Sequence, residues 1–87
     1  MARVEIYATM FCPFCYRAKQ LLEAKGVDYE ELDVTMRPGL RREMTERAAG
    51  QSSVPQIFID DVHVGGCDEL YALEAAGKLD PLLNGEA

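Results

Sequence analysis

Residues 9–19 read TMFCPFCYRAK, and the pattern of the chain changes inside this stretch. Before it, residues 3–8 (RVEIYA) alternate apolar with more polar side chains, which is typical of a β-strand. From Pro13 onward, apolar residues recur at helical spacing, and proline suits the first helical position because its missing N–H would be unpaired there. Two cysteines, Cys12 and Cys15, lie at this junction. The stretch therefore predicts a strand followed directly by a helix, with a cysteine pair where the two meet.

The middle of the chain continues this alternation. Gly26 is expected to end the first helix, and residues 27–34 (VDYEELDV) predict a second strand. Pro38 opens a second predicted helix, which has apolar residues along one face and ends at Gly50. Because a strand–helix–strand unit crosses over with a right hand, the first two strands are expected to pair in parallel.

The last third of the chain predicts a hairpin and a helix. Residues 55–60 (PQIFID) form a short apolar strand, and the Asp60-Asp61 turn leads into a partner strand at residues 62–64. A final helical pattern follows and ends at Gly77. Beyond it, Asp80-Pro81 predicts a cap and a first helical position for one more short turn.

The predicted order is β-α-β-α-β-β-α. The parallel pair and the antiparallel hairpin together require a mixed sheet of four strands, with helices on both faces. The chain of 87 residues is long enough for one small domain, which we expect to span residues 1–87. The expected fold class is α/β.

The composition argues against several functional classes. Nine basic and fifteen acidic residues give a net charge of -6, which opposes non-specific nucleic-acid binding. No apolar run is long enough to span a membrane, and the first residues lack the basic-then-apolar order of a secretory signal. Three cysteines are too few for the disulfide framework of a small secreted domain. We therefore expect a protein of the reducing cytosol, with neither a membrane nor a nucleic acid as partner.

The positions of the two close cysteines predict different chemical roles. Cys12 lies at the expected start of a helix, where unpaired N–H groups and the helix dipole stabilise a thiolate. The thiolate is the nucleophilic form of cysteine. Cys15 follows almost one helical turn later, on the apolar face, where burial would keep its thiol protonated. A redox pair in which Cys12 attacks first and Cys15 resolves is the predicted function of this motif.

The cysteines also allow two other interpretations, a zinc site or two buried free thiols. Structural zinc usually requires four Cys or His ligands, and this chain offers only Cys12, Cys15, Cys67 and His63, at a spacing that is not typical of zinc sites. His63 itself is expected on an exposed strand face, without a chemical role. Two buried free cysteines are a further possibility, but they leave unexplained why one of them begins a helix. We expect no metal.

Three motifs, CPFC, SVPQIFI and GGCDEL, occur in an order that resembles the glutaredoxins, and nearly the whole chain follows the resemblance. Within that family the chain is similar to the bacterial dithiol members, whose usual active site is C-P-Y-C. The resemblance implies the thioredoxin-like fold and a cis peptide bond before Pro55. It also implies a glutathione-dependent thiol–disulfide oxidoreductase that acts through Cys12 and Cys15. Its partners would be glutathione, as the reducing co-substrate, and disulfide-containing or glutathionylated proteins, with the enzyme acting as a monomer.

The resemblance further implies a set of glutathione-binding residues. Phe14 keeps an aromatic ring beside the thiol, and the backbone of Val54, before Pro55, would pair with the extended tripeptide. Gly66 lets the backbone approach closely, and the N–H groups of Cys67 and Asp68 would hold the γ-glutamyl carboxylate at a helix start. The Asp68 carboxylate would accept from the γ-glutamyl ammonium, although Asp68 could equally be a plain helix N-cap. Cys67 could be a regulatory thiol, but in the family its backbone matters more than its sulfur.

The glycyl carboxylate of glutathione has a less obvious partner. Many family members have a lysine three residues before the first active-site cysteine, and this chain has Thr9 there. Arg42 occupies a position where relatives often contact the ligand, and a bidentate pair could replace the lysine. Arg37 and Arg41 could reach the same region.

The sequence leaves open two alternatives to a glutathione-dependent oxidoreductase. One is a thioredoxin-like electron donor that a flavoprotein reduces. The other is a dimer that holds a [2Fe–2S] cluster through Cys12 and external glutathione, as some glutaredoxins do. Pro13 directly after the thiol stiffens that position and argues against the cluster.

Overall fold

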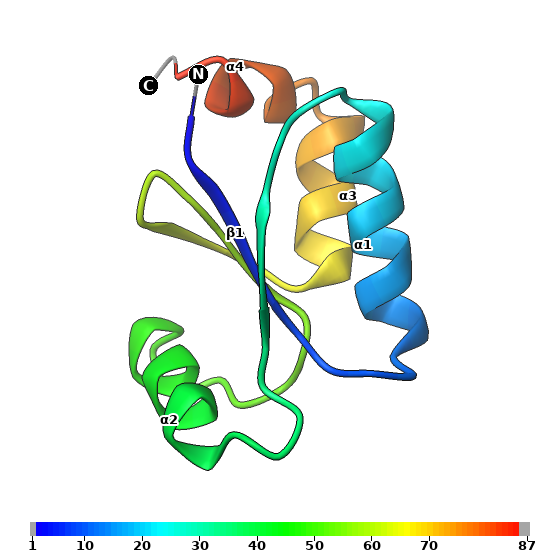
Figure 1. Cartoon of the computed structure of the whole chain (residues 1–87). Helices are drawn as coiled ribbons and strands as arrows, with labels where there is room; N and C mark the ends of the chain where they lie inside the picture. Colours follow the sequence, from blue (N-terminus) through cyan, green and yellow to red (C-terminus); the bar gives the residue numbers. More distant parts are fainter. Residues whose placement is uncertain (1, 86–87) are drawn as a thin grey trace.

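The computed structural model describes residues 2–85 and contains a mixed sheet with helices on both faces (Figure 1). In chain order the elements are β1 (Val4–Ala8), α1 (Pro13–Ala24), β2 (Glu30–Asp33), α2 (Pro38–Arg47), β3 (Gln56–Ile59), β4 (Val62–Gly65), α3 (Cys67–Ala75) and α4 (Leu79–Leu83). The predicted order is confirmed, and the expected last turn forms the short helix α4. No helix within residues 2–85 is both long and apolar enough to cross a membrane.

The four strands lie in the order β2-β1-β3-β4. Strand β1 runs parallel to β2, with Ile6 opposite Glu31, and antiparallel to β3, with Ile6 opposite Ile57. Strand β4 completes the hairpin with β3 through Asp60 and Asp61, whose φ angles of 50° and 66° are those of a two-residue turn that matches the sheet twist. The predicted mixed sheet is therefore confirmed, with β1 as a central strand.

Two hydrophobic clusters lie on opposite faces of this sheet. One joins the sheet to α1 and α3, which lie side by side in Figure 1, and contains Ile6, Leu22, Ile57 and Leu70 among its buried residues. The smaller cluster lies beneath α2 on the other face. Its members are Tyr7, Val34, Met44, Ala48 and Phe58. Because a buried side chain of this size contributes about 1.5–3 kcal/mol, both faces of β1 help to fix the strand that leads into Cys12.

Helix α2 is also attached to the sheet by an ion pair. Glu5 on β1 is 4% exposed, and Arg47 binds it with Nη2 to Oε1 at 2.9 Å and Nη1 to Oε2 at 3.3 Å. The guanidinium lies 4.1 Å from the centre of the Phe58 ring and also donates to the Tyr7 hydroxyl at 2.7 Å. The second face of β1 thus carries the buried carboxylate of Glu5, and Arg47 balances its negative charge.

Some predicted element boundaries were wrong. The second strand covers only residues 30–33, because Val27 and Tyr29 lie before it and pack against the core instead of pairing. The final helix begins at Leu79, not at Pro81. Asp80 does not cap it, because its carboxylate pairs with Lys25 at 2.9 Å. Proline is tolerated as the third helical residue because the N–H groups of a first turn have no helical partner.

Candidate active site

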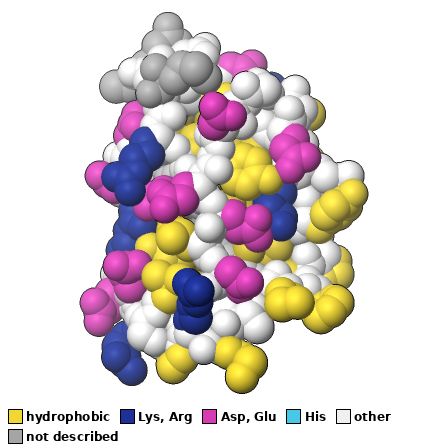
Figure 2. Space-filling view, viewed as in Figure 1, with side chains coloured by type: hydrophobic (Ala, Val, Ile, Leu, Met, Phe, Trp, Pro, Cys, Tyr) yellow, Lys and Arg dark blue, Asp and Glu magenta, His cyan; other side chains and the backbone are white. Residues whose placement is uncertain are grey.

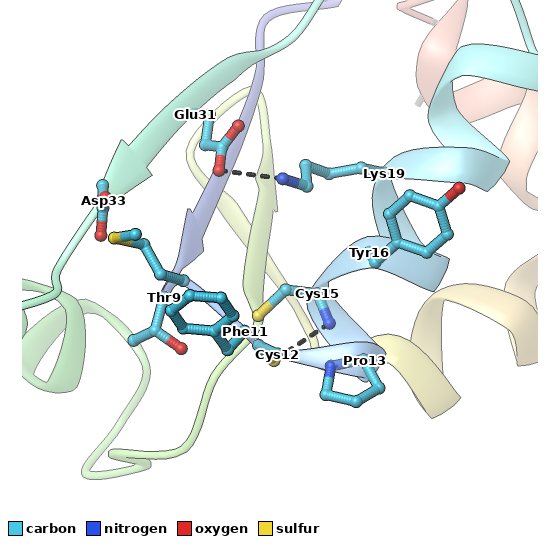
Figure 3. A pocket seen from close by; sticks show the side chains of 10 residues that line it. Thr9, Phe11, Cys12, Pro13, Cys15, Tyr16, Lys19, Glu31 and Asp33 are labelled. Atoms are coloured by element: carbon cyan, nitrogen blue, oxygen red, sulfur yellow. Dashed lines mark hydrogen bonds and ion pairs between the residues drawn. The ribbon is translucent and has the colours of Figure 1, made fainter.

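Cys12 is the residue that directly precedes α1. It is the N-cap, with an extended φ of -113°, and its Sγ accepts a hydrogen bond of 3.1 Å from the backbone N–H of Cys15 (Figure 3). Its side chain is partly exposed, and all three cysteines are free thiols. The Cys12 sulfur thus accepts a backbone N–H bond at a helix start and is accessible to an incoming disulfide.

Cys15 has the opposite environment. Its side chain is 1% exposed, and burial, with the neighbouring Cys12 side chain as second cause, raises the pKa of its thiol to about 12. Near neutral pH this thiol is protonated and unreactive toward solvent. Since Cys12 is accessible and Cys15 is not, the geometry permits an outside disulfide to reach only Cys12 first.

The loop before Cys12 exposes apolar side chains. Phe11 is 96% exposed and has a φ of +56°, a backbone conformation that is uncommon for a bulky residue. Met10 is 58% exposed, and its N–H donates to Thr35 Oγ1 at 3.0 Å, which ties this loop to the one after β2. Sequence reasoning did not single out Met10 or Phe11.

The segment before β3 contains the expected cis peptide bond between Val54 and Pro55. The side chain of Gln56, which is 1% exposed, donates from Nε2 to the Ser53 carbonyl at 3.0 Å. Its Oε1 accepts from His63 Nε2 at 2.6 Å. The expectation of an exposed His63 is wrong: the ring is partly buried because it binds Gln56 and lies over Phe58, with ring centres 5.1 Å apart.

The start of α3 differs in detail from the expectation. Gly66 is the N-cap, so the interpretation of Asp68 as a plain N-cap is wrong, and Asp68 is the second helical residue with an exposed side chain. Glu69 Oε1 accepts the N–H of Gly66 at 2.7 Å. Cys67 and Asp68 are the first two helical residues, whose N–H groups have no partner within the helix. Gly65 has a φ of +117°, and a Cβ there would lie 2.8 Å from Glu69 Oε1, so glycine is required.

Cys67 is buried at this helix start. Burial is the main cause that raises the pKa of its thiol, and the nearby Arg17 opposes it only in part. Because desolvation outweighs the helix terminus, the structure does not favour Cys67 as a reactive regulatory thiol. Cys67 nevertheless lines the groove described next.

A groove of about 150 Å³ lies between these segments. It is lined by Phe14, Val54, Pro55, Gly66, Cys67, Asp68 and Glu69. The fold thus brings together every residue that the resemblance nominated for glutathione except Arg42. Glu69 was missed, although its place three residues after Gly66 is the position from which an acidic side chain returns to the cap N–H.

Arg42 lies on the exposed face of α2 and lines neither of the two pockets described in this subsection. Its neighbour Arg41 donates from Nη2 to the Ser52 carbonyl at 2.9 Å, close to the segment that carries Val54. Arg37, also exposed, is the N-cap of α2.

A second and larger pocket, of about 510 Å³, opens beside the cysteine pair (Figure 3). Its lining residues are Thr9, Met10, Phe11, Cys12, Pro13, Cys15, Tyr16, Lys19, Glu31 and Asp33. Except for Glu31 and Asp33 on β2, they all belong to the loop after β1 or to α1. Phe14, on the same helix start, lines the smaller groove, so the two cavities flank the active-site loop.

Within residues 2–85, the His, Cys, Asp and Glu side chains form no group of three that could hold a metal ion. His63, one of the four residues that could have held zinc, instead forms a hydrogen bond with Gln56. The arrangement around Cys12 is suited to thiol chemistry.

The glutaredoxin family model matches residues 4–64, which hold the cysteine pair and most of the sheet. The chain belongs to the glutaredoxin family. Glutaredoxin 3 of Escherichia coli K12 is 57% identical over 83 residues, which cover 95% of this chain and 99% of that protein. The protein is therefore an oxidoreductase of the thiol–disulfide class.

Solved glutaredoxin structures have the same thioredoxin-like fold. The solution structure of glutaredoxin from Brucella melitensis is 53% identical, has a TM-score of 0.84, and covers 100% of this chain and 95% of its own. The crystal structure of the buckwheat glutaredoxin–glutathione complex has a TM-score of 0.88 at 26% identity, covering 97% of this chain and 78% of its own. The expected fold class is confirmed.

Proposed function

We propose that this glutaredoxin uses glutathione to reduce protein disulfides and protein–glutathione mixed disulfides through Cys12 and Cys15. The observation that carries the proposal is the groove beside the active-site loop, which unites residues from α1, the segment before β3 and the start of α3. The buckwheat glutaredoxin solved with glutathione supports a tripeptide as its occupant.

The groups that line the groove match the parts of glutathione. The N–H groups of Cys67 and Asp68, in the first turn of α3, would receive the γ-glutamyl carboxylate, since a helix N-terminus binds anions. The exposed Asp68 carboxylate would accept from the γ-glutamyl ammonium. The backbone of Val54, held next to Pro55, would pair with the extended peptide, and the half-exposed ring of Phe14 would cover it.

Arg42 is our candidate for the glycyl carboxylate. It is exposed on α2, and a flexible guanidinium can make a bidentate pair with a carboxylate. Thr9 cannot supply this charge. Because Arg42 lies outside the groove, its side chain would have to reach toward glutathione once the ligand is bound.

In the monothiol route, the Cys12 thiolate attacks the glutathione sulfur of a mixed disulfide. The protein thiolate leaves and takes a proton from solvent, and Cys12 becomes joined to glutathione. A second glutathione thiolate then attacks the glutathione sulfur and releases Cys12, with oxidised glutathione as product. Only Cys12 is required.

In the dithiol route, Cys12 attacks a protein disulfide, and one substrate thiolate leaves. Cys15 must then lose its proton, and its thiolate attacks Cys12 Sγ. The second substrate thiol is released, so two electrons have passed from the protein dithiol to the substrate and the protein is left with a Cys12–Cys15 disulfide. Two glutathione molecules reduce that bond.

The same proposal covers the oligomeric state of the protein and its location in the cell. We propose one domain over residues 1–87 that acts as a monomer in a reducing cytosol. Free thiols at positions 12, 15 and 67 agree with such a setting. Glutathione is a co-substrate here, and the proposal contains no metal.

The experiment that tests the proposal is the reduction of a glutathionylated peptide by glutathione, with glutathione reductase and NADPH as the readout. Cys15→Ser is expected to keep activity and Cys12→Ser to lose it. Both variants and the wild type should also be assayed with a thioredoxin reductase in place of glutathione. If the wild-type protein were inactive with glutathione but active with thioredoxin reductase, the proposal would be overturned and the thioredoxin-like alternative favoured.

A further inference from the structure

Most of the large apolar side chains exposed in residues 2–85 surround the nucleophile. The exposed set is Met10, Phe11, Phe14, Tyr16, Met36 and Val62, and the first four lie within four residues of Cys12. Figure 3 shows Phe11 and Tyr16 on either side of the cysteine pair, at the rim of the larger pocket. Figure 2 shows apolar side chains exposed at the lower right of the molecule, where β1 runs into α1 in Figure 1. Apolar groups gathered around a reactive thiol are typical of a surface that contacts another polypeptide.

The larger pocket has an acidic wall. Its one lysine, Lys19, is bound by Glu31, with Nζ and Oε2 3.0 Å apart. Asp33 remains as a second carboxylate, and its hydrogen bonds from Thr35 lower its pKa, so it is ionised at neutral pH. Apart from Cys12, the charged groups that line the pocket therefore sum to one net negative charge.

The position of this wall follows from the strand. Side chains alternate along β2, so Glu31 and Asp33 share the face toward α1, while Leu32 packs against the cluster on the opposite face. Because β2 is an edge strand of the sheet, its carboxylates stay accessible to a partner. Thr9 lines the same pocket and supplies no positive charge from the loop after β1, while Arg37 and Lys19 are close enough to Asp33 to help lower its pKa.

We propose that the larger pocket receives the polypeptide of the protein substrate, and that it selects segments with a lysine or arginine next to the reacting cysteine. Phe11 and Tyr16 contact the substrate backbone and apolar side chains, and Asp33 pairs with the basic side chain. The smaller groove stays free for glutathione. This inference rests on the proposed function only in taking Cys12 as the nucleophile, and it does not require glutathione as reductant.

The reaction that tests this inference is stoichiometric. The Cys12 thiolate attacks one sulfur of a cyclic peptide disulfide, and the other sulfur leaves as a thiolate that takes a proton from solvent. The Cys15 thiolate then attacks Cys12 Sγ, which releases the second peptide thiol. The two electrons from the protein dithiol end on the peptide, and the protein keeps the Cys12–Cys15 disulfide. No further reductant takes part.

The experiment uses pre-reduced protein in a single turnover with three cyclic peptides that differ only in a Lys, Gln or Glu beside one cysteine. Acid quenching and chromatography follow the reduced peptide. The rate is expected to fall from Lys to Gln to Glu by about two- to fivefold at each step, the range of an exposed ion pair. The differences should shrink in 0.5 M NaCl, because salt screens exposed charges.

Two variants and one matched control make the test specific. Asp33→Asn keeps an acceptor for Thr35 and should remove most of the preference for Lys over Glu. Phe11→Ala should slow all three peptides. Glu30→Gln removes one charge from the opposite face of the same strand and should change neither the rate nor the preference.

Each outcome decides between the two proposals. Equal rates for all three peptides, or a preference that Asp33→Asn leaves intact, would overturn the inference while Cys12 remains the nucleophile. Failure of the reduced protein to reduce any of the peptides would overturn both the inference and the assignment of the dithiol. Failure with glutathione alone would overturn only the proposed reductant.

Discussion

The side-chain amide of Gln56 donates a hydrogen bond of 3.0 Å to the carbonyl of Ser53 and so holds the segment that contains Val54. Gln56 is itself held at its other end by His63 on β4, at 2.6 Å. The backbone that we propose to pair with glutathione is therefore positioned by a buried side chain on β3 and a ring on the neighbouring strand. Neither of the two residues lines the groove.

This arrangement predicts that Gln56→Leu weakens glutathione binding more than it changes the chemical step. We expect KM for a glutathione mixed disulfide to rise several-fold while kcat stays nearly constant. The free energy of unfolding should fall by about 1–3 kcal/mol, because His63 and the Ser53 carbonyl lose a partner. Gln20→Leu, at an exposed position of α1, is the matched control. An unchanged KM in Gln56→Leu would contradict the positioning role.

The assignment of Arg42 predicts a different kinetic effect. Arg42→Gln should raise KM for glutathione about two- to fivefold, the effect of one exposed charge pair. Arg41→Gln should have a smaller effect, because that guanidinium already binds the Ser52 carbonyl. Steady-state kinetics at low and high salt check both variants. If only Arg41→Gln raised KM, the neighbouring arginine would be the ligand contact.

The burial of Cys15 predicts a pH-dependent stability. Its pKa is about 12 in the folded protein and about 8.5 in an unfolded chain. A raised folded pKa means that its contribution is complete below about pH 8.5 and is lost as the pH rises toward 12. Under reducing conditions, the stability advantage of wild type over Cys15→Ala should therefore shrink between pH 7.5 and 10.5. Urea unfolding at both pH values measures it, and a constant difference would show that burial does not raise this pKa.

The pair of Glu5 and Arg47 predicts a large loss of stability when one partner is removed. Arg47→Met leaves the buried Glu5 carboxylate with only the more exposed Arg3, whose Nη2 lies 3.3 Å from Glu5 Oε2. We expect a cost of about 2–3 kcal/mol, below the cost for fully buried pairs because Arg3 remains and Arg47 keeps 26% of its side chain exposed. Arg42→Met on the same helix should cost less than about 0.5 kcal/mol. If Arg47→Met and Arg42→Met lowered the free energy of unfolding equally, the ion pair would not hold α2 to the sheet. Glutathione-driven activity of Arg47→Met, measured well below its unfolding temperature, should be retained.

The environment of Cys12 predicts the reduction potential of the dithiol. Cys12 Sγ accepts the Cys15 N–H at 3.1 Å in the reduced protein, which stabilises the dithiol relative to the disulfide. We therefore expect a potential in the glutaredoxin range of about -200 to -230 mV, measured by equilibration with glutathione buffers. A value near the thioredoxin potential of about -270 mV would show that this stabilisation is small.

Much of the fold follows from patterns that are local in the chain. The alternation in residues 3–8, the proline at position 13 and the glycines that end the helices all act within a few residues, so the order of elements could be predicted. Gly26 and Gly77 have the positive φ angles expected just beyond a helix end. The start of α4 could not be predicted, because the Asp80 carboxylate pairs with Lys25, which is distant in the sequence.

Local patterns in the chain are enough to predict that a cysteine begins a helix, that a second cysteine follows on its apolar face, and that strands and helices alternate around them. Which residues meet at the thiol depends on the tertiary packing. Phe14, Val54 and Asp68 share a groove because β1 and β3 pair and α1 packs beside α3. The same packing buries Cys15 and places Asp33 in the larger pocket. Local propensity extends over a few residues, whereas shared burial joins segments that are forty or more residues apart, and a single sequence contains no direct record of such contacts.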